Sequence, residues 1–378
     1  MKLIYITNNR LPTLKAHGVQ IAKMGEAFSK NRIAFELLYP QRKNFIKEDF
    51  FDFYGLKTRF KMTKIWSWDL VGVVPKLGFR LQSLTFAWGV LFYLIKKKYK
   101  GVIYSRDPFS ALFLSFNKNW KVVFEVHFLP DKIKFYNKFL FKRVYKIIAI
   151  SQGLKKDLIS IGISENKILI APDGVDLSDF DKVKESKEEL RKKLGLPQGK
   201  KIIMYTGHLY KWKGVYVLAQ AGGLLKKGSV VVFVGGTSKD IQKFKKFIKK
   251  KNIKNIILAG YQKTKLIPYY LKSADILVLP NSGNKKISFH YTSPLKLFEY
   301  MASGRPVVAS SLPSIKEILN ENNAIFFKPD NIQDLAQKIN LALQNSDLSV
   351  NISKQAFFKV KKFTWEKRAQ KIIKFINQ

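Results

Sequence analysis

The feature that most constrains this chain is an alternation of short apolar segments and helical segments, which runs along the chain twice. In the first half, apolar segments at 2–7, 33–39 and 101–105 are separated by stretches with helical periodicity. The same alternation restarts at Lys201. Strands that alternate with helices predict parallel sheets with right-handed crossovers. We therefore expect an α/β protein made of two doubly wound, Rossmann-like domains that face each other across a cleft.

The domain boundary is expected where the composition changes. With 378 residues, 46% of them hydrophobic, the chain is long enough for two separate cores. A highly charged stretch begins at Asp176, which predicts a first domain at 1–175 and a second at 176–350. The remaining residues, 351–378, have the pattern of a basic amphipathic helix.

The charge of the chain points to a polyanionic partner. Lys and Arg number 69 against 27 Asp and Glu, a formal net charge of +42. Specific readers of nucleic acid favour arginine, whereas this excess is almost all lysine, so no specific nucleic-acid partner is expected. An anionic membrane surface is one candidate partner, and a lysine-rich solvated surface is the alternative. The basic and aromatic stretch 132–146 fits a helix on a membrane or a helix packed on the sheet.

Several classes of site are not indicated. The absence of cysteine excludes disulfides and thiolate chemistry, and four histidines leave little room for a zinc site. The chain has no P-loop, Gly-x-Gly-x-x-Gly or Asp-x-Asp motif. No signal peptide is visible, and the apolar stretch Leu84–Ile95 is shorter than the roughly 20 residues that span a bilayer. We expect no transmembrane helix, no metal and a cytoplasmic protein.

One predicted helix carries the signals of an anion site. Ser293 is expected to cap it, Pro294 to occupy its first turn and Gly304 to end it. Lys296 and Glu299 share one side of this helix, at its start. A lysine near a helix N-terminus opposes the macrodipole unless an anion is bound there, so we expect a phosphate at Lys296 and a sugar hydroxyl at Glu299.

Other candidate residues follow strands of the second half. His208 and Lys213 come after the strand 201–206, Gly235 after the next strand, and Tyr261 after the third. Each alone has an ordinary structural explanation. Together they would meet at the carboxyl edge of a parallel sheet, where a single ligand reaches all of them. Two lysines and a helix N-terminus suit a diphosphate without a metal ion.

The first half offers weaker candidates. Gly18 stands at a helix start, where a tight turn is sufficient explanation. His127 follows the strand 122–126, and a lone histidine is more often structural than catalytic. Arg106 and Asp107 also lie at the carboxyl end of an expected strand.

Several motifs together resemble a known family, the retaining glycosyltransferases of the GT-B fold in family 4, also called glycosyltransferases group 1. The similarity spans nearly the whole chain, and the central helix motif is the most specific part. The motifs that carry it are Tyr205-Thr-Gly-His-Leu-Tyr-Lys-Trp-Lys-Gly214, Pro280-Asn-Ser-Gly283 and Ser293–Val308, supported by Ala149–Gly153, Ala171–Asp176 and Phe363–Glu366.

The resemblance implies a set of roles. Lys213 and the amides that begin at Leu295 would bind the donor diphosphate, Glu299 would bind the ribose, and His127 would contact the transferred sugar. The final helix would cross back to the first domain. The implied catalytic residues are His127, Lys213 and Lys296, and the implied donor-binding residues are Gly18, His208, Lys213, Gly235, Tyr261, Ser293, Pro294, Leu295, Lys296 and Glu299.

Two positions depart from the family pattern. His208 stands where the family usually has arginine, which weakens one phosphate contact or makes it pH-sensitive. Tyr291, eight positions before Glu299, replaces an acidic residue that helps to hold the sugar in the family. These departures leave the donor sugar open.

The sequence thus favours a metal-independent, retaining transferase. It would move a hexosyl-type sugar from a nucleotide diphosphate sugar to an acceptor held by the first domain, such as a lipid-linked saccharide or polysaccharide at a membrane. No cofactor is expected beyond the donor substrate. The alternative is a basic protein that binds nucleic acid or membrane and keeps a vestigial sugar-nucleotide cleft. A sugar-nucleotide epimerase would need an acidic and histidine set that the sequence does not supply.

Overall fold

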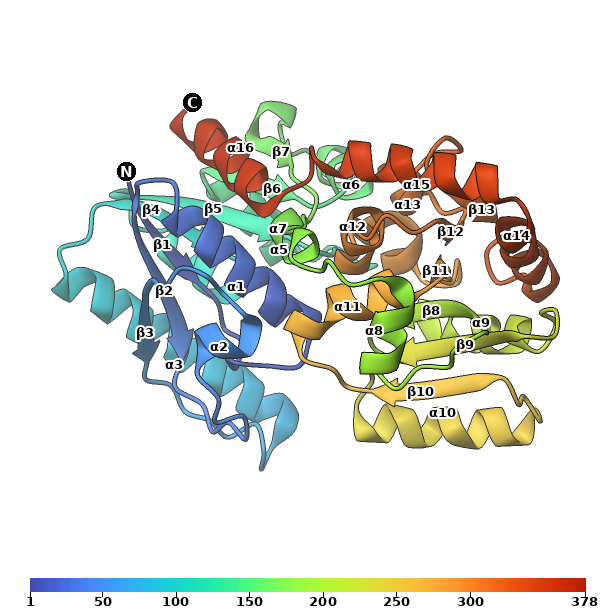
Figure 1. Cartoon of the computed structure of the whole chain (residues 1–378). Coiled ribbons are helices and arrows are strands. Elements are labelled where there is room, and N and C mark those ends of the chain that lie inside the picture. Colours follow the sequence, from blue (N-terminus) through green and yellow to red (C-terminus); the bar gives the residue numbers. More distant parts are fainter. The chain divides into compact units, whose positions relative to one another are not determined.

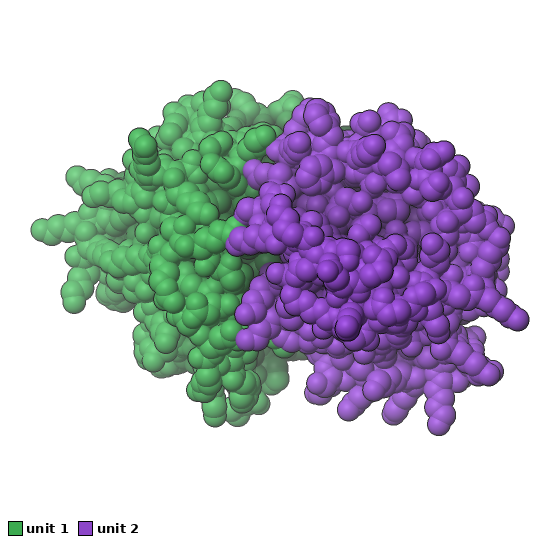
Figure 2. All heavy atoms as spheres, in the orientation of Figure 1, with its two compact units in different colours: residues 1–172, 365–378 green, residues 173–364 purple.

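The computed structural model describes all 378 residues and divides them into two compact units (Figures 1 and 2). Unit 1 comprises residues 1–172 and 365–378, and unit 2 comprises residues 173–364. Each unit holds one wholly parallel sheet with helical crossovers. This confirms the α/β class and the two doubly wound, Rossmann-like domains.

Unit 1 is built on a seven-stranded sheet in the order β3-β2-β1-β4-β5-β6-β7. The strand order reverses between β1 and β4, which is where such sheets place ligands at their carboxyl ends. Its elements are β1 Lys2–Ile6, α1 Ala16–Ser29, β2 Ala34–Pro40, α2 Phe50–Tyr54, β3 Lys61–Ile65, α3 Pro75–Lys96, β4 Gly101–Ser105, α4 Pro108–Leu114, β5 Trp120–Val126, α5 Phe135–Arg143, β6 Lys146–Ala149, α6 Gln152–Ser160, a 3-10 turn Glu165–Lys167, β7 Ile168–Ile170 and α16 Trp365–Asn377.

The end of the chain returns to unit 1, as the resemblance implies. Helix α16 belongs to unit 1 and packs on α1 (Figure 1). The expected single tail helix at 351–378 is wrong in one respect, because α15 (Ser346–Val360) ends before α16 begins and stays in unit 2. Residues 361–364 link the two helices, and the backbone of Val175 bridges to Thr364.

Helix α3 is longer than the sequence pattern indicates. It begins at Pro75, where the ring suits a first helical turn, and runs for 22 residues. By length and composition alone, it is the one helix that could cross a membrane. Of its most apolar 18 residues, 39% are buried in the fold. Phe86, Val90 and Leu94 on this helix are completely buried, so one side of α3 forms part of the core of unit 1.

Two regions with ambiguous patterns are also resolved. The aromatic region 41–80, which shows no clear helical or strand periodicity, contains α2, β3 and the first six residues of α3. In the basic and aromatic stretch 132–146, helix α5 packs inward through Leu140 and Phe141, while Phe135 stays 81% exposed. Packing on the sheet therefore explains only one side of α5.

Unit 2 has a six-stranded sheet in the order β10-β9-β8-β11-β12-β13, with its reversal between β8 and β11. Its elements are α7 Leu177–Asp181, α8 Lys187–Lys193, β8 Lys201–Thr206, a 3-10 turn Lys211–Lys213, α9 Val215–Gly222, β9 Ser229–Val234, α10 Ser238–Lys250, β10 Ile256–Gly260, a 3-10 turn Thr264–Leu266, α11 Ile267–Ser273, β11 Ile276–Leu279, a π-helix Ile287–Tyr291, α12 Leu295–Ala302, β12 Val307–Ser310, α13 Pro313–Lys316, β13 Ile325–Phe327, α14 Ile332–Gln344 and α15.

The sheet of unit 2 is buried on both faces, which explains its apolar, β-branched strands. Along β8, Ile202 and Met204 join one hydrophobic cluster, whereas Ile203 and Tyr205 join the cluster on the opposite face. With both faces covered, only the ends of the strands are left to present polar groups to a ligand.

Candidate functional site

Helix α12 starts differently from the prediction. The residue at its N-cap position is Pro294, whose side chain cannot accept a hydrogen bond from the first turn. Ser293 is therefore not the cap. Its hydroxyl instead accepts a hydrogen bond from the backbone N–H of Asp173, at 2.9 Å. The predicted end is confirmed, since Gly304 follows the helix with a φ of 70°, a conformation that favours glycine.

Lys296 is buried at this helix start. Its side chain lies over the ring of Tyr205, with Nζ 3.6 Å from the ring centroid, and Nζ has no hydrogen-bond partner. A side chain at Gly207, just beyond β8, would lie 2.8 Å from Nζ. Lys296 and Tyr300 are both buried, so this side of the helix faces the protein interior and not solvent. A buried, unpartnered ammonium group at a helix N-terminus is a strong attractor for an anion.

Lys213 and Glu299 both act on the charge of Lys296. Burial lowers the pKa of Lys296 well below its usual value, Lys213 lowers this pKa further, and Glu299 raises it. Burial also lowers the pKa of Lys213 to about 8. Two lysines that disfavour each other's charge are arranged for a ligand with more than one negative charge.

The turn that carries Lys213 is fixed at the reversal of strand order. The backbone N–H of Ser282, just beyond β11, donates to the carbonyl of Trp212 at 3.1 Å. Gly214 has a φ of 73°, and a side chain there would overlap the carbonyl of Pro280. Glycine is therefore required for the turn to pack between β8 and β11, the position at which doubly wound sheets bind ligands.

His208 lies in the same group but is poorly suited to be a cation. Its ring stacks on Tyr210, with centroids 4.9 Å apart, and Nδ1 is 3.7 Å from a carboxylate oxygen of Asp240. Burial lowers the pKa of His208, and Lys296 and Lys213 act in the same direction, against Asp240. A neutral imidazole at pH 7 attracts phosphate less than arginine does.

The ends of β8, β9 and β10 also come together. The backbone N–H of Gly235 donates to the carbonyl of Gly260 at 2.6 Å. A side chain at Gly235 would lie 2.5 Å from the carbonyl oxygen of Gly207, so only glycine fits. Tyr261, which follows Gly260, is 41% exposed. The structure thus gathers His208, Lys213, Gly235, Tyr261, Lys296 and Glu299 at the carboxyl edge of this sheet.

A buried tyrosine holds α12 over β8. The hydroxyl of Tyr300 accepts a hydrogen bond from the backbone N–H of Thr206 at 2.8 Å. Replacing Tyr300 with Phe is expected to lower the free energy of unfolding by about 1–3 kcal/mol, because a buried N–H loses its partner. Urea denaturation measures this, with Tyr269→Phe as a control whose ring contacts Lys193. Equal effects of the two substitutions would count against the role of the Tyr300 hydroxyl.

The segment before α12 is unusual in its backbone. Tyr291 ends the π-helix Ile287–Tyr291, a form often found at functional sites, and its side chain is 1% exposed. Lys286 lies over the Tyr291 ring at 5.2 Å. The hydroxyl of Ser314 donates to the carbonyl of Ser288 at 2.7 Å, which ties the π-helix to α13. Tyr291 therefore packs inward where the family pattern has an acid.

Unit 1 holds a separate polar cluster around Glu125, near the carboxyl end of β5. Glu125 is 1% exposed, and its carboxylate accepts hydrogen bonds from Gln20 at 2.7 Å and from Arg368 of α16 at 3.0 Å. The hydroxyl of Tyr104 also contacts it. Burial alone would raise the pKa of Glu125, but Arg368, His127 and Arg106 hold it well below the usual range. The cluster keeps one negative charge deep in the unit.

This carboxylate orients His127. His127 Nε2 lies 2.5 Å from Glu125 Oε1, and the histidine side chain is 27% exposed. Burial and the charge of Arg106 lower the pKa of His127 to about 4, despite Glu125. A neutral ring therefore donates from Nε2 to Glu125, which leaves Nδ1 as an acceptor for a ligand hydroxyl.

Gly18 and Asp107 have structural explanations. A side chain at Gly18 would overlap the hydroxyl of Tyr54, whose oxygen also accepts a hydrogen bond from the backbone N–H of Thr13. Gly18 is thus required for α1 to pack closely against Tyr54 and Thr13. Asp107 caps α4 by accepting from the N–H of Ser110 at 2.7 Å. Arg106, in contrast to Gly18 and Asp107, does belong to the polar cluster, because its Nε lies 3.9 Å from a carboxylate oxygen of Glu125.

Two members of the Glu125 cluster were missed as functional residues. Glu125 lies inside a fully apolar strand pattern, and a buried carboxylate must have partners, which was a usable signal. Arg368 lies on the apolar side of α16 with Trp365, Ala369 and Ile372. That spacing predicts that Arg368 is buried, but its partner, Glu125, can be identified only from the folded structure.

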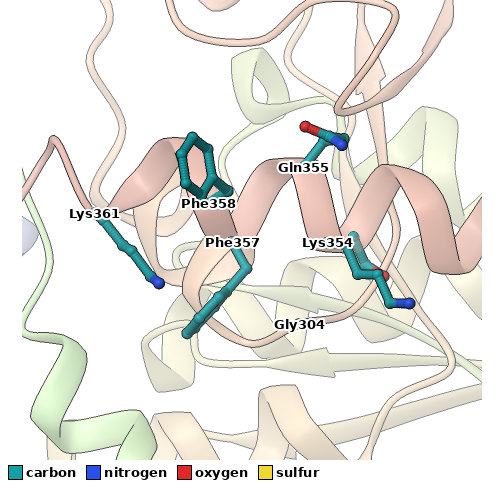
Figure 3. Close-up of a pocket in the computed structure, with 7 residues that line it drawn as sticks. Gly304, Lys354, Gln355, Phe357, Phe358 and Lys361 are labelled. Carbon is teal, nitrogen blue, oxygen red and sulfur yellow. The ribbon is translucent and has the colours of Figure 1, made fainter.

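A hollow elsewhere in unit 2 is unrelated to these residues (Figure 3). It is formed mainly by α15, and Figure 3 shows Phe357 and Lys361 beside Gly304. None of the predicted site residues lines it. No group of three or more His, Cys, Asp or Glu side chains is placed to hold a metal ion.

Two family models match the chain. The model for glycosyl transferases group 1 matches residues 186–375, and the model for glycosyltransferase family 4 matches residues 18–179. The first covers the sheet edge with Lys213, Lys296 and Glu299. The second covers most of unit 1, including Gln20, Arg106, Glu125 and His127, whereas Arg368 lies within the range of the first.

Curated relatives agree with these models over part of their length. A Bacillus subtilis protein named as a teichuronic acid biosynthesis glycosyltransferase, TuaC, is 28% identical over 51% of this chain and 45% of its own length. The N,N'-diacetylbacillosaminyl-diphospho-undecaprenol alpha-1,3-N-acetylgalactosaminyltransferase of Campylobacter jejuni is 26% identical over 58% of this chain and 56% of its own. The chain thus matches about half the length of these relatives.

Solved structures share the whole fold at low identity. Sucrose-phosphate synthase from Thermosynechococcus elongatus superposes with a TM-score of 0.82 at 16% identity, covering 100% of this chain and 98% of that one. HepE of Anabaena, solved with UDP and glucose, gives 0.78 at 16% identity, covering 100% of both chains. With both the family model and the fold in agreement, the chain belongs to the glycosyl transferases group 1 family and has the two Rossmann-like domains of the GT-B fold.

Proposed function

We propose that this protein transfers a sugar from a nucleotide diphosphate sugar to an acceptor hydroxyl. The observation that carries the proposal is the buried ammonium group of Lys296, which has no hydrogen-bond partner and lies at the N-terminus of α12 beside Lys213. The relatives named as glycosyltransferases support the reaction type. The neighbour solved with UDP makes uracil the first base to test.

The diphosphate is bound by Lys213, Lys296 and the first N–H groups of α12, including that of Leu295. These groups neutralise the charge that develops as the bond between the sugar C1 and the diphosphate breaks, and no metal ion takes part in the proposed step. Glu299, one turn further along α12, accepts hydrogen bonds from the ribose hydroxyls. The segments at Gly235 and Tyr261 contact the base.

Unit 1 supplies the acceptor side of the reaction. The acceptor oxygen forms the new bond to C1, the diphosphate leaves with the electron pair of the old bond, and the acceptor proton passes to the departing phosphate. His127 contacts the transferred sugar through Nδ1, and Gly18 approaches the donor. We propose a hexosyl-type sugar, retention at C1 and a lipid-linked saccharide or polysaccharide acceptor in the cytoplasm at a membrane surface. The undecaprenol-linked reaction named for the Campylobacter relative supports this acceptor class.

A thermal-shift screen of nucleotide sugars tests the donor. A specific donor is expected to raise the melting temperature progressively with its concentration, because it stabilises the folded state by RT ln(1 + [L]/Kd). Glu299→Ala should abolish the shift, whereas Glu321→Ala, at an exposed position of the same unit, should preserve it. If no nucleotide sugar shifts the transition of the parent protein, the proposal is wrong.

NMR of the anomeric proton of the product then tests retention.

The alternative, a basic binding protein with a vestigial site, makes the opposite prediction. It expects strongly salt-dependent binding to RNA or vesicles and no response to any nucleotide sugar. An epimerase would convert the donor in the absence of acceptor, which product analysis detects. The intact set of Lys213, Lys296 and Glu299 favours transfer.

A further inference from the structure

An apolar stripe runs along the outer side of α3. It consists of large hydrophobic side chains that are about half exposed or more. They are Leu77, Leu84, Trp88, Phe92 and Ile95. Their spacings of seven, four, four and three residues place them on one side of the helix. Because the opposite side of α3 is fully buried in the core, α3 is apolar both toward the protein and away from it.

Aromatic rings extend this stripe across two further helices. Three ring pairs are tilted against each other: Trp88–Phe92 (6.1 Å between centroids), Trp88–Phe113 (5.1 Å) and Phe116–Phe139 (5.9 Å). A fourth pair, Phe135–Phe139 (6.0 Å), is stacked. Phe113 belongs to α4, Phe116 follows it, and the last two belong to α5. Helices α3 and α4 pack together, as do α4 and α5, so the rings form one surface of unit 1. We call the α3 stripe and these rings the aromatic face.

The charge around the aromatic face is strongly positive. Residues 75–146 contain fifteen Lys and Arg and only three Asp and Glu. Of these three acids, Asp107 and Glu125 are buried in structural contacts, so only Asp131 is exposed. Arg143 lies over the ring of Phe116 at 4.1 Å. Exposed apolar surface with a cationic margin is complementary to an anionic lipid bilayer.

We propose that the aromatic face docks unit 1 on an anionic phospholipid membrane, with α3 lying in the plane of the interface. Spanning is disfavoured, because crossing the bilayer would pull Phe86, Val90 and Leu94 out of the core of unit 1. A nucleic acid is also disfavoured, because Leu77, Leu84 and Ile95 have no ring on which a base can stack. The proposal depends only on the surface of unit 1 and stands or falls separately from sugar transfer.

Flotation of the full-length protein with vesicles tests this surface. Binding is expected to vesicles rich in phosphatidylglycerol, to be much weaker with phosphatidylcholine alone, and to fall as salt is raised. Phe92→Asp should reduce the partition to anionic vesicles by about tenfold or more, since an apolar contact is replaced by a charge of the wrong sign. Phe358→Asp is the matched control, because Phe358 on α15 and Phe92 are both 65% exposed.

Trp88 provides a second measurement. Its indole is 50% exposed, so its fluorescence should shift to shorter wavelength when anionic vesicles are added, and Trp88→Phe should remove that shift. Circular dichroism and a cooperative thermal transition establish that Phe92→Asp is folded. The proposal is overturned if the parent ignores anionic vesicles, if Phe92→Asp and Phe358→Asp behave alike, or if RNA is bound and vesicles are not.

Discussion

Replacing Lys296 with methionine is expected to produce a protein that is more stable and yet unable to bind the donor. Lys296 is 8% exposed, and its Nζ makes no hydrogen bond. Leaving such a group buried costs about 1–3 kcal/mol, which methionine, of similar length, avoids. The same substitution removes the cation that we propose contacts the diphosphate, so kcat/KM should fall by roughly a hundredfold or more, as for other charged transition-state contacts.

The stability of the parent should also depend on pH through Lys296. Its pKa in the folded protein lies well below the ordinary value of 10.5, so between these two values the unfolded chain binds more protons than the folded one. The free energy of unfolding therefore rises with pH across this window. Lys213, with a folded pKa of about 8, acts in the same sense between about 8 and 10.5. Lys296→Met should flatten the profile.

Urea denaturation at several pH values and calorimetric titration with UDP measure these effects. Lys272→Met is the control, because Lys272 is a partly buried lysine of the same unit whose Nζ donates to the carbonyl of Val183 at 2.9 Å. That substitution should destabilise the protein and leave UDP binding unchanged. A destabilised Lys296→Met that still binds UDP would contradict the anion site.

Replacing Glu125 with alanine should strongly destabilise unit 1. The carboxylate is buried with Arg368 at 3.0 Å, and removing one member of such a pair leaves an uncompensated charge at a cost of about 3–5 kcal/mol. Activity should fall with it, because His127 loses the acceptor that fixes its ring. Since Glu125→Ala could fail to fold, Glu125→Gln retains the shape and should fold with reduced kcat and little change in donor binding.

Glu125 and His127 should make the protein less stable in acid. Glu125 has a folded pKa well below its ordinary 4.5, so its contribution is present above that value and is lost as pH falls through the folded pKa. His127, with its pKa lowered from 6.5 to about 4, adds a loss of stability as pH falls between these values. Glu125→Gln should therefore weaken the acid sensitivity measured by melting temperature.

Glu165→Gln is the control for this pair of variants, because Glu165 pairs with Lys155 at the surface. It should leave both the melting temperature and the acid profile unchanged. A Glu125→Gln protein with the stability, kcat and acid profile of the parent would show that the carboxylate does not support His127.

Periodicity was enough to predict the two parallel sheets, because buried strands and helices each have a clear pattern. It did not reveal how deeply Lys296 is buried, because that burial comes from the packing of α12 against β8 and α15. It placed the start of α12 one residue early, because Ser293 is a good cap by type but is held by Asp173. It predicts a helix only over 81–95 and so misses the first six residues of α3, where polar and apolar residues alternate without a helical pattern.

The candidate site was predictable to the extent that it lies at strand ends. Lys213, Gly235 and Lys296 follow strands or open a helix, and parallel topology brings such positions to one edge. The partners of Glu125 were not predictable in this way. Gln20 lies on α1, Arg106 follows β4 and Arg368 lies on α16, and only the packing of α16 against α1 brings the last of them to the carboxylate.

The return of α16 to unit 1 has a consequence for how the protein is made. Glu125 and Arg368 are 243 residues apart in the chain, with all of unit 2 between them. A ribosome that has released the whole of 1–172 has therefore still not supplied the arginine that balances this buried carboxylate. The support of His127 is completed only when synthesis is nearly finished, so nascent and C-terminally truncated chains carry an unfinished histidine site.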